Sequence, residues 1–131
     1  MVGVVEGEAG TRTASSGMVV DTFQLYAVQP TEVVVGSVAG RFTVPLLRSS
    51  RLRDDPREAK WEHFRPLAIA GTYVFFLGPQ QPTGEWVPGP EPWSFRVTDK
   101  VRPESTWPPA SWLFAASSLA DFLGEIKSLP R

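Results

Sequence analysis

Residues 71–77, GTYVFFL, constrain the fold more than any other stretch of the chain. After Gly71 come β-branched and aromatic residues, which suit the pleated backbone of a strand. From Tyr73 onward no polar residue alternates with the apolar ones, so both faces of this strand are expected to be buried. A strand that is buried on both faces belongs in the middle of a sheet. The segment therefore predicts a β-rich domain with this strand at its centre.

Further strands are indicated where apolar and polar residues alternate with a period of two. They are predicted at residues 2–8, 18–28, 31–47 (one or two strands, broken near Gly36 or Gly40) and 93–98. In the second of these, Val19, Phe23 and Leu25 are predicted to share one apolar face, with Tyr26 on the opposite face. Asp21 falls on the apolar face, which predicts a later start of the strand or a β-bulge there.

Polar and proline-rich stretches are predicted to connect these strands. TRTASSG at 11–17 is predicted to be a turn, and Pro30 is predicted to end the strand that precedes it. GPQQPTG at 78–84 begins a longer predicted loop that runs to residue 92.

The segment 48–66 is the charge-rich part of the chain and has two interpretations. Asp55 as N-cap, Pro56 at the first helical position and Glu58 in a capping box predict a short helix over 56–64. The same residues are equally compatible with an ordered loop.

A second helix is indicated near the end of the chain. Ser118 and Asp121 have the spacing of a capping box. The apolar residues that follow at helical spacing are Leu119, Phe122, Leu123 and Ile126. Because this apolar stripe needs a partner, the helix is expected to pack across the sheet.

Length and composition are those of an ordinary globular protein, expected to be a single domain over 1–131. The chain is 42% hydrophobic and 21% charged, with a net charge of −1, which makes a nucleic-acid partner unlikely on electrostatic grounds. No apolar run approaches the roughly 18 residues of a membrane-spanning helix. Without cysteine, disulfides and thiolate chemistry are excluded, and the single His63 does not make a metal site alone. No cofactor is indicated.

Source and compartment are left open by the same composition. Arginine outnumbers lysine and there are 13 prolines, which is typical of a thermophile and equally of a GC-rich genome. Met1 is followed directly by a predicted strand rather than by a signal peptide. The chain is therefore expected to be cytoplasmic, or exported after removal of a signal.

Several of these segments together resemble a known family. The positions concerned are Val2, Gly3, Val5, Gly71, Tyr73, Phe76, Leu77, Phe95, Val97, Leu119, Phe122, Leu123 and Ile126. In this spacing they resemble the small bacterial OB-like domains, mostly of unknown function, that are often found in exported proteins. The resemblance implies a mainly β fold, a small five-stranded OB-like barrel with a C-terminal helix, and implies no catalytic residue. A small β-sandwich is the alternative fold.

The candidate binding residues are aromatic. They are Trp86, Trp93, Trp107, Trp112 and Tyr73. An exposed set of such rings could stack on bases, sugars or a proline-rich peptide, whereas buried rings would only fill the barrel ends. Trp86 lies in a Pro/Gly-rich loop, so the loop around 79–92 is the predicted contact surface. Its carboxylates, Glu85 and Glu91, are interpreted as solubilising residues.

Catalytic patterns are lacking in the sequence. The carboxylates have no interpretable catalytic spacing, and His63 has no nucleophile pattern near it. The chain is therefore predicted to be a non-enzymatic binding or protein-interaction module for an unknown protein or small ligand. The alternative is a binder of single-stranded nucleic acid or oligosaccharide that uses an aromatic barrel face.

Overall fold

A computed structural model describes residues 1–38, 40–61, 64–89, 93–103 and 118–128. Its elements are β1 (Val2–Ser16), β2 (Val19–Glu32), β3 (Phe42–Leu52), β4 (Ala59–Lys60), β5 (Thr72–Phe75), β6 (Leu77–Gln80), β7 (Trp86–Pro88), β8 (Ser94–Val97), β9 (Val101–Pro103) and α1 (Leu119–Ser128). The prediction of a mainly β fold with a C-terminal helix is confirmed.

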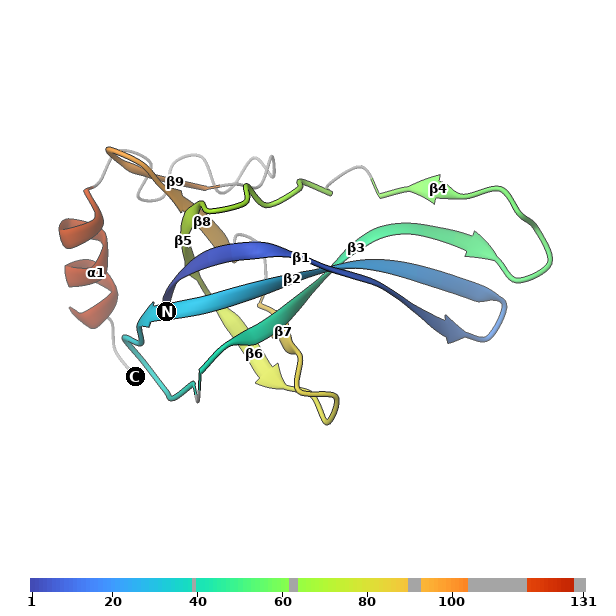
Figure 1. Cartoon of the computed structure of the whole chain (residues 1–131), viewed down its shortest axis with the longest axis horizontal. Helices are drawn as coiled ribbons and strands as arrows, with labels where there is room; N and C mark the ends of the chain where they lie inside the picture. Colours follow the sequence, from blue (N-terminus) through green and yellow to red (C-terminus); the bar gives the residue numbers. More distant parts are fainter. Residues whose placement is uncertain (39, 62–63, 90–92, 104–117, 129–131) are drawn as a thin grey trace.

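The main sheet has seven strands in the order β4-β3-β2-β1-β5-β8-β9, and every neighbouring pair is antiparallel. A separate hairpin, β6-β7, lies beside it. The sheet curls into an open half-barrel with α1 at one end (Figure 1). The five-stranded OB-like interpretation allowed a closed or a partly open barrel, and the described strands form an open sheet with seven strands rather than a closed barrel.

Strand β5 lies inside this sheet, between β1 and β8, so the prediction of an interior strand is confirmed. Tyr73 and Val74 are fully buried and Phe75 is 1% exposed. Because successive side chains of a strand point to opposite faces, Tyr73 and Phe75 enter one core while Val74 enters another. Gly71 precedes the strand because a Cβ there would lie 2.9 Å from the carbonyl oxygen of Ala68. Side chains of this apolar segment thus contribute to two cores, one on each face of the sheet.

Helix α1 covers the Val74 face and confirms the second predicted helix. The Ser118 hydroxyl accepts a hydrogen bond from the backbone N–H of Asp121 at 3.2 Å, so Ser118 is the N-cap. Phe122 is fully buried, and its ring lies 5.1 Å from that of Phe95 on β8. The predicted stripe therefore closes the second core.

The β1–β2 hairpin is longer than predicted, and the interpretation of residues 11–17 as a turn is wrong. Strand β1 continues to Ser16, and Gly17 and Met18 alone reverse the chain into Val19. Gly17 has φ of +60°, as a tight hairpin turn requires. The stretch was misread because its polar residues reflect solvent exposure of a strand. Pro30 does not end β2, which runs on to Glu32.

The distal ends of β1, β2 and β3 project beyond the half-barrel together with β4. We call this projection the arm and define it as residues 11–23 and 47–60. It extends away from α1 to the right in Figure 1. The rest of the described chain is called the body.

The buried face of β2 is the opposite of the predicted one. Tyr26 is 1% exposed, whereas Phe23 and Leu25 are only half-buried. An irregularity in the β2–β3 register falls between Thr22 and Phe23, close to the bulge predicted at Asp21. The Asp21 carboxylate accepts a 2.6 Å hydrogen bond from Ser50, so its position on a partly exposed face is stabilised.

Two further predicted segments differ from the structure. Residues 33–35 do not form a strand, and β3 begins only at Phe42, after the predicted break around Gly36 and Gly40. The predicted helix over 56–64 is wrong for its described residues, because Ala59 and Lys60 form β4 instead. The Asp55 carboxylate binds the backbone and side chain of Arg57 in a local turn, so it does not begin a helix.

Candidate functional site

Two of the five aromatic candidates lie inside the first core. Tyr73 is fully buried and Trp93 is 8% exposed. Phe75 lies between them, with ring centroids 5.5 Å from Tyr73 and 5.9 Å from Trp93, so the three rings form one stack. The Tyr73 hydroxyl accepts a hydrogen bond from the backbone N–H of Ala68 at 2.9 Å. Trp107 and Trp112 lie outside the described residues.

Trp86 is half-buried at the margin of the same core. It opens β7 and packs edge-on against Phe42 at 6.5 Å between ring centroids. The predicted loop of 78–92 thus contains the β6–β7 hairpin, and Trp86 has a packing role that the sequence did not reveal. The structure does not bring Trp86 into the Tyr73–Phe75–Trp93 stack.

Glu85 is not the solubilising loop residue that the sequence suggested. It is 7% exposed, and its two carboxylate oxygens accept hydrogen bonds from Arg12 Nε at 3.0 Å and Arg12 Nη2 at 2.7 Å. The Arg12 guanidinium also lies 4.9 Å from the ring centre of Phe23. This bidentate pair fastens the β6–β7 hairpin to β1. Because the partners lie 73 positions apart, no local pattern could have revealed it.

A groove of about 480 Å³ lies at the end of the arm and is open to solvent. It is lined by Val19, Ser50, Arg51, Leu52, Asp55, Arg57, Glu58 and Ala59. Val19 and Leu52 are directly opposite each other on β2 and β3. Leu52 is 56% exposed, and Met18, in the adjoining turn, is 59% exposed. Apolar side chains from two strands and a turn are therefore exposed together.

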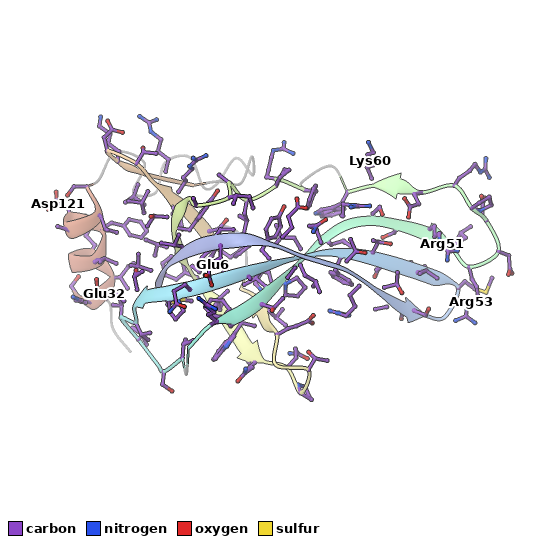
Figure 2. The ribbon with its side chains drawn as sticks, viewed as in Figure 1. Glu6, Glu32, Arg51, Arg53, Lys60 and Asp121 are labelled. Carbon is purple, nitrogen blue, oxygen red and sulfur yellow. The ribbon has the colours of Figure 1, made fainter. Side chains whose placement is uncertain are left out.

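The charges around this groove are largely compensated within the arm. Arg57 Nη2 lies 2.6 Å from Asp55 Oδ2, and this hydrogen bond lowers the pKa of Asp55 and raises the pKa of Arg57. Arg51 Nη1 donates to the backbone carbonyl of Arg53 at 3.1 Å. Figure 2 shows Arg51 and Arg53 at the end of the arm, with Lys60 on β4. The groove is thus an apolar surface bordered by charged side chains.

A second hollow, of about 290 Å³, lies between the 33–38 segment, the end of β5 and α1. Its lining includes Val34, Val35, Phe76 and Ile126. These four side chains offer only packing surface. Met1 also lines the hollow; its α-amino group donates to the Phe75 carbonyl oxygen at 3.0 Å, and burial lowers the pKa of that group. Phe76 also packs edge-on against Phe122 at 6.4 Å, so this hollow belongs to the edge of the second core.

No group of three or more His, Cys, Asp or Glu side chains gathers closely enough to hold a metal ion in the described ranges. Within the same residues, no helix has the length and apolar character needed to cross a membrane. Comparison of the chain with family models, with curated proteins and with solved structures finds no match. The site must therefore be argued from its own geometry.

Proposed function

We propose that this chain is a non-enzymatic protein-interaction module whose groove on the arm receives an apolar side chain from a protein partner. The observation that carries the proposal is the exposure of Val19 and Leu52 in the lining of that groove, with exposed Met18 in the turn next to Val19. Exposed apolar side chains that are scattered singly need no explanation, but a contiguous group marks an interaction surface. Core packing does not account for these three apolar side chains, because none of them belongs to either core.

The chemistry of the groove favours an uncharged group as its occupant. Asp55 and Arg57 neutralise each other, and Arg51 donates to the backbone carbonyls of Leu52 and Arg53. A partner that brought a charge to Asp55 or Arg57 would lose hydration and would have to compete with the existing ion pair. A leucine, methionine or phenylalanine on an extended segment fits this surface. The groove is open to solvent, which suits a protein segment better than a small ligand, because ligand sites enclose most of their ligand.

The OB-like interpretation of the fold is also a proposal. The curled antiparallel sheet and the helix that closes its end support it. Two of the three described aromatic candidates, Tyr73 and Trp93, are buried, and Trp86 is half-buried against Phe42, so they do not favour a nucleic-acid or oligosaccharide function. Binding of a protein partner at the arm is therefore the function that we propose.

Selection of peptides by phage display against the full chain tests the proposal. Enriched peptides are synthesised with a fluorophore and titrated by anisotropy against the wild type, Val19→Ser and Leu52→Ser. Ile69→Ser is the matched control, because Ile69 is 53% exposed and lies outside the arm. We expect the dissociation constant to rise roughly tenfold for each arm variant, as for the loss of about 1.4 kcal/mol, and to stay unchanged for the control.

Peptides that bind the wild type and both arm variants equally would contradict the proposal. It would also fail if no peptide were enriched while poly-dT quenched tryptophan fluorescence in a salt-sensitive way. That second result would favour the nucleic-acid alternative.

A further inference from the structure

Strand β1 has a long edge without a strand partner. On one side it pairs with β2 from Val2 to Ser16. On the other side it pairs with β5 only through residues 2–4, and the last backbone hydrogen bonds there join Val5 to Ala70 and Gly71. Beyond Val5, no strand of the described chain pairs with that side. In Figure 1 the distal part of β1 runs along the outer border of the arm.

The regular part of this edge is short and well delimited. An irregularity between Glu8 and Thr11 ends it toward the body, and the turn at Gly17 ends it at the tip. We call residues 11–16, TRTASS, the free edge. Thr11, Thr13 and Ser15 are exposed, so the edge is open to solvent over its length.

The free edge lacks the features that usually protect a sheet edge from pairing. Proline, lysine, inward-pointing charges and bulges are the common protective devices. Residues 11–16 contain none of these except the charge of Arg12, and its guanidinium is held by Glu85. The opposite border of the same arm is protected, because β4 has only two residues, Lys60 is one of them, and Pro56 precedes it. The arm therefore has one protected and one unprotected edge.

We propose that a second copy of this chain pairs with the free edge, antiparallel and about a two-fold axis, so that the two arms form one continuous sheet. The pairing adds backbone hydrogen bonds along an edge that no strand of the described chain pairs with. It does not rest on the peptide groove, which is lined from β2, β3, β4 and the loop before β4.

The sequence of the free edge is compatible with itself in this arrangement. Alternate residues of a strand point their N–H and C=O groups toward the same edge. In an antiparallel pair, two residues that face each other point these groups either both toward the partner strand or both away from it. When the two strands are identical copies related by a two-fold axis, the axis must therefore pass through a residue that faces its own copy. Within residues 11–16 that residue is Thr13 or Ala14. Arg12 then faces Ala14 or Ser16 of the second copy, and the two arginines do not face each other. Apart from Arg12, all residues that face each other across the pair are uncharged and either small or β-branched. The pairing therefore avoids repulsion between like charges.

The test is sedimentation velocity of the full chain from low to high micromolar concentration, with four variants. Thr13→Lys and Thr13→Glu each place like charges across the pair. The two charges are directly opposite when the axis passes through Thr13 and diagonal neighbours when it passes through Ala14. Because long side chains interact in both positions, we expect each variant to raise the dimer dissociation constant by roughly tenfold or more, with the larger effect in the first register. An equal mixture of the two variants is expected to recover the dimer, because unlike charges then face each other. Recovery by mixing also shows that neither variant had simply failed to fold.

Ala59→Lys is the matched control on the protected edge, and Ser37→Lys is a control in the body. Both residues are exposed, and both variants are expected to dimerise as the wild type does. Amide hydrogen exchange is expected to slow within residues 11–16 as concentration rises. A wild type that stays monomeric throughout would overturn the proposal. So would a dimer that is lost in Ala59→Lys and retained in both Thr13 variants.

Discussion

The body and the arm share three strands, β1, β2 and β3, but are stabilised differently. In the body, β1, β2 and β3 contribute to two buried cores that lie on either side of β5. In the arm, Val20 is the one buried apolar side chain, and no arm residue belongs to either core. Strand pairing and polar contacts hold the arm instead. We infer that stability resides in the body, while the arm is free to present surfaces to partners.

The boundary between the two regions has its own structural features. The irregularity between Glu8 and Thr11 interrupts the β1–β2 register there. Gln24 is 6% exposed, and its side-chain amide donates to the carbonyl oxygen of Gly10 at 3.0 Å, which satisfies a group that the irregular pairing would leave unbonded. The Arg12–Glu85 pair lies next to this point. The junction is thus held by specific polar contacts.

Truncation of Phe122 is expected to have the largest effect. The ring is fully buried in the second core, against Phe95 and Phe76. Phe122→Ala should lower the free energy of unfolding by about 3–5 kcal/mol, the usual cost of removing a buried aromatic ring. Equilibrium urea unfolding measures this change. A loss below about 1 kcal/mol would mean that the packing of α1 contributes little to the stability of the body. It would contradict the inference that stability resides in the body rather than in the arm.

Loss of the buried carboxylate at the junction should have an intermediate effect. Glu85→Gln removes the charge that Arg12 binds and leaves a partly buried guanidinium without its counter-ion. Because the Arg12 side chain is 35% exposed, solvent compensates part of the loss, and we expect about 1–2 kcal/mol of destabilisation.

A double-mutant cycle isolates the contribution of this pair. Arg12→Met and the double variant complete the cycle with Glu85→Gln in urea unfolding. If the two single effects simply add, the pair does not fasten the hairpin to β1, and the junction must be held by other contacts.

Removal of the N-cap of α1 should cost about 1 kcal/mol. Ser118→Ala deletes the hydroxyl that accepts the N–H of Asp121. Ser128→Ala, at the other end of the helix, is the control, because that exposed hydroxyl donates to the carbonyl of Glu125, and its loss should change stability by less than about 0.5 kcal/mol. Equal effects of the two substitutions in thermal unfolding would argue against a capping role for Ser118.

The predictions from sequence succeeded mainly in the body. The interior strand and the final helix were predictable because each depends on a local pattern. These patterns are the apolar run at 71–77, of which Thr72–Phe75 form β5 and Leu77 already begins β6, and the spacing of Phe122, Leu123 and Ile126. Burial in the cores keeps such patterns strong. In the arm both faces are largely exposed, so residues 11–16 have no apolar face and were mistaken for a turn.

The exposure of the candidate site residues could not be predicted from the sequence, for a related reason. Tyr73 and Trp93 were chosen because they are aromatic, but composition does not distinguish a stacked core from an exposed surface. Val19 and Leu52 come from strands that pair only in the folded chain, and their exposure depends on which elements cover them. The helix predicted from Asp55 failed because that carboxylate had a closer partner in Arg57. Each failure arises where tertiary or side-chain contacts override a local pattern.

Substitution of Leu52 is expected to have the smallest effect on stability. It tests most directly whether the arm, unlike the body, lacks a core of its own. The side chain is 56% exposed at the end of the arm, and its main neighbour is Val19 across the strand pair. The backbone hydrogen bond from Asp55 N–H to the Leu52 carbonyl is kept in Leu52→Ser. We expect the free energy of unfolding to change by less than about 0.5 kcal/mol in urea. A loss above about 2 kcal/mol would show that the arm has a core of its own, and reduced peptide binding by this variant would then reflect unfolding of the groove rather than a lost contact.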